Sequence, residues 1–232
     1  MSFIDDLGSA LKSIGDSISK ALSNSEMIKA LLPVLGLVLP PPLDVVAVVG
    51  LMAISAALGQ PEDPEKLGYQ MNKAGKEGIS PDDFDSFKEY KEHLDKNFPF
   101  DQKEFDKLSD AQKSACRYVG MAGTMQELKE EKGFDISAEA LKMFAGSDGK
   151  PLGNTGLTTK EEKGNFVANV TTEMQAQGFH SLQPVVDYAK GELEHVSDGP
   201  KVEAAVQKVL DSTPGLEDKD TFEVICSLAD KE

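Results

Sequence analysis

Arginine is almost absent from this chain of 232 residues, in which Arg117 is the sole example. Tryptophan is absent too, and the chain has 40 acidic residues against 24 basic ones, a net charge of −16. A protein that binds a phosphate backbone needs clustered Lys and Arg, so this balance argues against nucleic acid as a partner. One guanidinium group also leaves almost no means of clamping phosphates or carboxylates in a bidentate manner.

Cysteine and histidine are scarce as well. Cys116 and Cys226 lie far apart with no C-x-x-C pattern, which favours two small buried side chains over a disulfide or a redox site. The three histidines, His93, His180 and His195, have no regular spacing and no neighbouring cysteine, which argues against a zinc site. We therefore expect neither a bound metal nor a cofactor.

Catalytic motifs are missing from the sequence. No G-x-S-x-G, H-E-x-x-H or dinucleotide fingerprint occurs. The candidate catalytic groups are Cys116 with Arg117 and either His93 or His180 as base, and His195 with Glu192 and Glu194 as an acid–base cluster. The first group can be explained without catalysis, because Cys116 lies in a segment with the apolar periodicity of a packed helix. The second group is typical of a helix face exposed to solvent. We therefore expect that the protein is not an enzyme.

The segment 146–156 is the longest expected loop, and neither common loop motif fits it. An EF-hand beginning at Asp148 would have Lys150 and Leu152 where oxygen ligands are needed. A phosphate-binding loop would require Gly-Lys-Ser/Thr at a spacing that the segment lacks. No ion or nucleotide site is therefore expected here.

Charge divides the chain into two parts. Residues 1–60 carry three Lys against five acidic residues, a net of −2, so −14 of the total lies in residues 61–232. Between the parts runs Gly59-Gln60-Pro61-Glu62-Asp63-Pro64, whose prolines cannot continue a helix. We therefore place a domain boundary at residue 60.

An amphipathic helix of low charge is expected at the N-terminus. Apolar residues recur there at spacings of three and four, which places them along one helix face. The stripe consists of Ile4, Leu7, Leu11, Ile14, Ile18 and Leu22. Such a helix is marginal alone, so it needs a surface to dock on, either protein or lipid.

The same region lacks the features of a cleavable Sec signal, because no Lys or Arg precedes a short apolar run. Seven serines occur in the first 25 residues. A serine-rich amphipathic start resembles the uncleaved export signals of type III secreted bacterial proteins. This resemblance implies export by a route that does not read a Sec signal.

The segment 30–59 is strongly apolar, with Asp44 as its one charge. Three successive prolines interrupt it, and the two pieces would reach about 15 and 22 Å as helices, short of a ~30 Å hydrocarbon core. The pattern predicts a helical hairpin that turns at Pro40, Pro41, Pro42 and Asp44. Its contact residues would be Leu35, Val38, Val45, Val49, Met52 and Ile54.

Two interpretations of the hairpin remain open. It could meet a membrane or drive self-association, since small residues in its second half permit close helix contact. It could also lie buried in the fold or in an oligomer interface, because a helix that is apolar on every face belongs in a core or a bilayer. Release of a buried hairpin would combine the two.

Residues 61–232 are expected to form an all-helical array. Capping residues recur, at Asp101, at Ser109 with Gln112, at Ser137 and at Thr158. Two of the expected helices run over 81–96 and 181–196. Because period-2 runs of β-branched residues are absent, we expect no sheet and an all-α fold.

These features predict a non-enzymatic bacterial protein that interacts with a membrane, or with another protein or a second copy, through residues 1–60. It would be secreted, as a translocator, effector or injected protein, or membrane-associated. The first alternative is a cytoplasmic structural or adaptor protein whose hairpin is buried. The second is an enzyme of unknown class.

Overall fold

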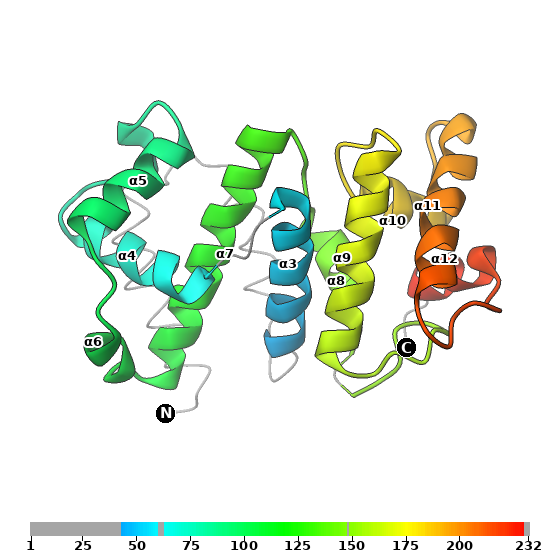
Figure 1. Cartoon of the computed structure of the whole chain (residues 1–232), viewed down its shortest axis with the longest axis horizontal. Helices are drawn as coiled ribbons and strands as arrows, with labels where there is room; N and C mark the ends of the chain where they lie inside the picture. Colours follow the sequence, from blue (N-terminus) through cyan, green and yellow to red (C-terminus); the bar gives the residue numbers. More distant parts are fainter. Residues whose placement is uncertain (1–42, 60–62, 148, 230–232) are drawn as a thin grey trace. The chain divides into compact units, whose positions relative to one another are not determined.

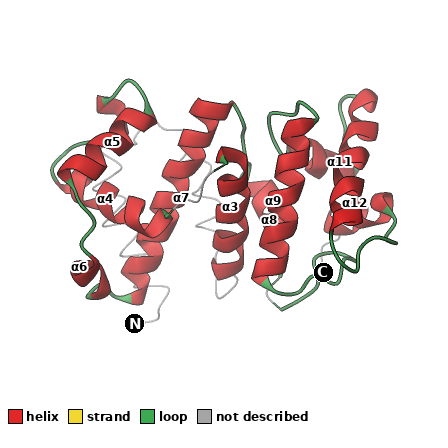
Figure 2. Cartoon of the chain, viewed as in Figure 1, coloured by secondary structure: helices red, strands yellow, loops and turns green. Residues whose placement is uncertain are grey.

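The computed structural model describes residues 43–59, 63–147 and 149–229, which form helices joined by loops and turns (Figure 2). No strand occurs in these residues, and one isolated β-bridge joins Asp135 to Ser181. The predicted all-α fold is therefore confirmed. The expected amphipathic helix and the first half of the hairpin lie outside the described residues.

The chain divides into two compact units. The first contains α4 (Pro64–Lys76), the 3₁₀ turn η1 (Pro81–Asp83), α5 (Phe87–Asn97), α6 (Gln102–Asp106) and α7 (Asp110–Lys132). The second contains α3 (Leu43–Leu58), α8 (Ala138–Ala145), α9 (Lys160–Ala176), α10 (Gln183–Lys190), η2 (Val196–Asp198), α11 (Gly199–Ser212) and α12 (Thr221–Ala229). The described part of residues 1–60 thus belongs to the second unit, and the boundary at residue 60 stays a prediction.

Side-chain caps begin several helices where the sequence predicts. The carboxylate of Asp101 accepts the backbone N–H groups of Lys103 and Glu104, and Ser137 Oγ accepts that of Ala140. Ser109 and Gln112 form a reciprocal capping box at the start of α7. Each of these bonds pairs a donor that the first turn of a helix leaves without a partner.

Three predicted boundaries are wrong. The expected helix over 81–96 is split, because its start closes as a 3₁₀ turn and Ser86 then caps a new helix, α5. The expected helix over 181–196 ends at Lys190, because Gly191 adopts a left-handed φ of 72°. Helix α9 is capped by Thr159 rather than Thr158, since Glu162 is the residue that completes the box.

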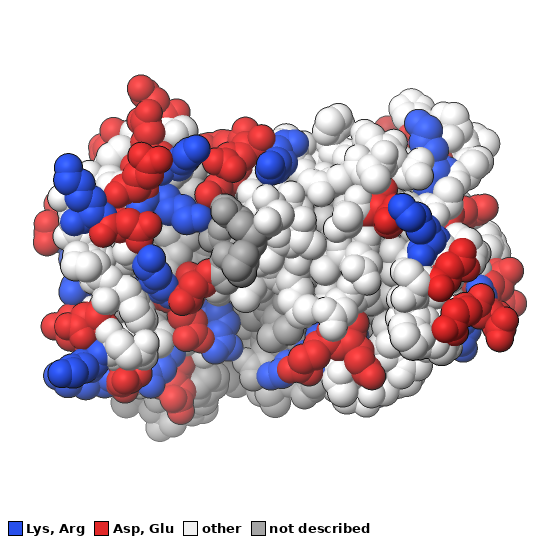
Figure 3. Space-filling model, viewed as in Figure 1, with Lys and Arg blue, Asp and Glu red and all other residues white. Residues whose placement is uncertain are grey.

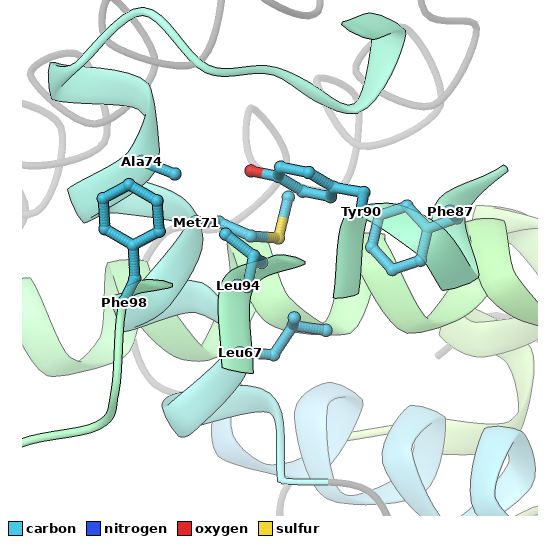
Figure 4. Packing of buried hydrophobic residues seen from close by; sticks show 7 residues of the cluster. All are labelled: Leu67, Met71, Ala74, Phe87, Tyr90, Leu94 and Phe98. Atoms are coloured by element: carbon cyan, nitrogen blue, oxygen red, sulfur yellow. The ribbon is translucent and has the colours of Figure 1, made fainter. Parts of the chain in front are cut away.

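The core of the first unit lies between α4 and α5. Leu67, Met71 and Ala74 of α4 are buried against aromatic and aliphatic side chains of α5 and of the residue that follows it (Figure 4). The partners are Phe87, Tyr90, Leu94 and Phe98. At the edge of this core, Lys91 Nζ lies 2.8 Å from a carboxylate oxygen of Glu127, whose side chain is 4% exposed.

Two glycines let α4 and α7 approach to backbone contact. A Cβ atom on Gly68 would lie 2.6 Å from the carbonyl carbon of Cys116, and one on Gly120 would lie 2.7 Å from that of Pro64. Backbone atoms cannot move aside as a flexible side chain can. The crossing therefore requires glycine on both helices.

We predict that Gly68→Ala lowers the free energy of unfolding by about 1–3 kcal/mol, because the added methyl group forces the helices apart. Alanine otherwise favours a helix over glycine by about 1 kcal/mol, so the sign of the change is diagnostic. Gly199→Ala is the control, since its Cβ would meet a Tyr188 ring carbon at an ordinary 3.4 Å. Urea unfolding followed by circular dichroism measures both, and a stabilised Gly68→Ala would contradict the crossing.

Candidate functional site

The apolar helix α3 packs against α9 and α8 inside the second unit (Figure 1). Helices α3 and α9 run side by side in the same direction. The side chains of Val49, Ala53 and Ile54 have no exposed surface. Between residues 49 and 58 one side of α3 is buried, whereas Leu51, Met52, Ser55 and Ala56 are half-buried.

The contact between α3 and α9 depends on Gly164. A Cβ atom placed there would lie 3.4 Å from Met52 Cβ and 3.2 Å from Met52 Cγ, so the Met52 side chain lies directly over this glycine. Farther along, Gln175 Nε2 donates to the carbonyl oxygen of Ala57 at 3.4 Å. Glycine on α9 thus provides the space for a long side chain on α3.

The residue before this glycine joins α9 to α8. Lys163 is fully buried, and its ammonium group donates to the carbonyl oxygens of Ala145 at 3.1 Å and Ser147 at 2.7 Å. These carbonyls lie at the C-terminal end of α8, where the helix dipole favours a positive charge. Lys163 therefore holds together the two helices on which α3 packs.

The structure locates part of the predicted site. Val49 and Ile54 are buried, Met52 is half-buried against α9, and Val45 lies in the first turn of α3. Asp44 is the second residue of α3 rather than part of a turn, a position where the helix dipole favours an acid. Ile4, Leu7, Leu11, Ile14, Ile18, Leu22, Leu35, Val38, Pro40, Pro41 and Pro42 lie outside the described residues.

Cys116 lies in an environment that opposes a reactive thiolate. Its side chain is fully buried in α7, and this burial, with the nearby charge of Glu65, raises the pKa of Cys116 to about 11. Arg117 forms an ion pair with Glu65. A reactive cysteine needs a lowered pKa, so the geometry gives this thiol no activation.

The other candidate groups do not form a site. The ring of His93 packs at a tilted angle near the rings of Phe84 and Phe98, with centroid distances of 5.0 and 6.1 Å. His180 is exposed in the loop after α9. His195, Glu192 and Glu194 are also exposed, in the loop between α10 and η2 rather than on a helix face.

The end of the glycine-rich loop after α8 contacts α12. Ser227 Oγ accepts the backbone N–H of Asn154 at 2.9 Å, and Lys219 Nζ donates to the Asn154 carbonyl oxygen. Leu152 is buried beneath the loop. Within the described ranges, no cluster of His, Cys, Asp or Glu is arranged to hold a metal.

Comparison with protein-family models, with curated proteins and with solved structures finds no match to this chain. Among the helices that the structure describes, none is both long and apolar enough to span a membrane.

Sequence reasoning did not single out Gly164 or Lys163, although a glycine inside a helical pattern is a signal of close packing. The most distinctive feature of the described chain is therefore α3 and its contact with α9.

We predict that Ile54→Ala lowers the free energy of unfolding by about 2–5 kcal/mol, since a fully buried side chain leaves a cavity behind. Leu51→Ala, at a half-buried position of the same helix, should cost less. Urea titration gives both values. Equal and near-zero costs would show that α3 is not packed in solution.

Acid should weaken the start of α9. Hydrogen bonds from Thr159 and from the backbone of Thr158 lower the pKa of Glu162 below its usual 4.5. The stabilisation of the folded state by the ionised Glu162 carboxylate is therefore complete above about pH 4.5. It is lost as the pH falls through the lowered pKa of Glu162. We predict that Glu162→Ala flattens the pH dependence of unfolding in this acidic range. Glu161→Ala, in the same turn, should leave the wild-type slope unchanged, and identical slopes for the wild type and Glu162→Ala would refute the capping role.

Proposed function

We propose that the protein is a non-enzymatic, membrane-interacting protein that keeps an apolar helix folded away until it meets a lipid surface. The single observation in support is α3, a helix of 16 residues with one charge, whose side chains between residues 49 and 58 are buried or half-buried. Residues 1–42, with their apolar stripe and apolar run, precede it directly and would meet the same surface. The protein would be secreted or membrane-associated, exported by a route that does not read a Sec signal.

The hydrophobic effect does not oppose the transfer of α3 from the protein core to a lipid surface. Each Val or Ile side chain gains about 1.5–3 kcal/mol on leaving water, and hydrocarbon provides an environment as apolar as the protein core. The cost of release lies mainly in the cavity that α3 leaves against α8 and α9. At 1.5 Å per residue α3 is about 24 Å long, so alone it would insert only part-way or lie in the interface.

The acidic composition suggests that a low pH favours binding to an anionic membrane. Residues 61–232 carry a net charge of −14, which repels an anionic membrane near neutral pH. Protonation of surface carboxylates removes part of this repulsion.

A second candidate is a structural or adaptor protein, with a cytoplasmic location, in which α3 never leaves the fold. The complete burial of Val49, Ala53 and Ile54 favours it. The two candidates differ in one respect, namely whether α3 separates from α9.

A reversible crosslink between α3 and α9 tests the proposal. Met52→Cys with Gly164→Cys places two Cβ atoms about 3.4 Å apart, at the short end of the roughly 3.5–4.5 Å that a disulfide spans. Cys116 and Cys226 are replaced by alanine so that one disulfide forms. Deleting residues 1–60 is a poorer test, because it removes α3 and exposes the helices that contact it.

Flotation with vesicles of phosphatidylcholine and phosphatidylglycerol, at about pH 7 and pH 5, gives the readout. We expect the wild type and the reduced double variant to float, more at the lower pH, and the oxidised variant to stay in the soluble fraction. The single variant Met52→Cys is the control for the loss of the methionine, and the reduced double variant is the control for both substitutions. Absence of lipid-bound protein at both pH values would refute membrane binding, and equal flotation of oxidised and reduced protein would refute release of α3.

A further inference from the structure

A patch of the second unit, formed by parts of α3 and α9, carries no charged side chain, although the whole chain has a net charge of −16. We call this surface the neutral face (Figure 3). Its α9 part is uncharged, with Asn165, Asn169, Thr172 and Ala176 exposed and Ala168 half-buried. Its α3 part consists of the half-buried residues Leu51, Met52, Ser55 and Ala56.

Charged residues border the neutral face without entering it. Lys160, Glu161 and Glu162 lie in the first turn of α9, before the neutral face begins at Asn165. On the side of α11, Lys208 forms an ion pair with Glu173 at 2.7 Å. The face extends from Asn165 to Ala176, about 16 Å along α9 at 1.5 Å per residue.

The absence of charge on the neutral face indicates which kind of protein binds there. A basic partner finds no carboxylate on it and an acidic partner finds no ammonium group, so electrostatic attraction favours neither. Two copies of this acidic chain repel each other wherever charged surfaces meet, and the neutral face lets them approach without opposing like charges. We propose that the neutral face is a self-association surface whose partner is the same face of a second copy.

The residue types suit a two-fold contact. In such an interface the same patch of both copies meets, so a contact of one residue with a second residue occurs twice. The face must therefore be complementary to itself. The Asn169 amide can both donate and accept a hydrogen bond. Thr172 Oγ1 donates to the Ala168 carbonyl oxygen at 3.0 Å, which leaves its lone pairs to accept from an amide of the second copy. Ala168 and Ala176 allow the helices to come close.

This inference does not rest on membrane binding. The neutral face exists with α3 packed on α9, and most of it belongs to α9, outside residues 1–60. Vesicle flotation and self-association can therefore succeed or fail separately.

Sedimentation of the full-length chain tests the proposal, from about 1 to 200 µM protein and in about 0.05 and 0.5 M salt. We expect a monomer–dimer equilibrium that strengthens at the higher salt, because screening reduces the repulsion between acidic bodies. Asn169→Glu and Asn169→Lys should each weaken dimerisation by about tenfold or more, since each sets like charges opposite each other. An equimolar mixture of the two variants should restore it, because opposite charges then meet.

Gln102→Glu is the control, because Gln102 is exposed on α6 of the first unit, and no residue of that unit belongs to the neutral face. It should dimerise as the wild type does. A wild type that stays monomeric under all conditions would overturn the proposal. So would an Asn169→Glu variant that still dimerises, which is the outcome if association runs through residues 1–42, or a mixture that fails to recover.

Discussion

The packing of the apolar helix α3 on a glycine of α9 organises the second unit. Gly164 gives Met52 the space to lie over α9, and the neighbouring Lys163 fixes α9 to the end of α8. A side chain larger than glycine at this position would have to displace Met52. Two adjacent residues of α9 thus have different roles: Gly164 leaves space for α3, and the charge of Lys163 binds α8.

Both units use the same device. In the first unit, Gly68 and Gly120 bring α4 and α7 into backbone contact, and the ion pair of Lys91 with Glu127 closes the edge of the core. The α4–α7 and α3–α9 contacts differ in how easily the atoms opposite the glycine can move aside. Carbonyl groups oppose any side chain at Gly68, whereas the flexible end of Met52 opposes one at Gly164. The contact of α3 with α9 is accordingly the more adaptable of the two, which suits a helix that we propose is released.

Local features of the sequence predicted the fold well. Caps such as Asp101 and Ser109 act on the next three residues, so the sequence pattern alone indicates where those helices begin. The helix that ends at Gly191 was predicted too long, because a left-handed glycine stops it before the apolar pattern ends. The contact of Met52 with Gly164 could not be predicted, since it joins segments more than a hundred residues apart and neither residue carries a motif. The apolar run indicated that α3 needs an apolar environment, but only the structure shows which helices provide it.

Hydrogen exchange at the amide groups of α3 tests the account most directly. If α3 is an interior helix in solution, the amides of Ala53 and Ile54 should exchange as slowly as those of Val167 and Val170 in α9, since both pairs are fully buried. Addition of anionic vesicles at about pH 5 should then change protection in α3 and α9 together. Exchange of Ala53 and Ile54 at the rate of an unfolded peptide, with α9 still protected and no lipid present, would contradict the account.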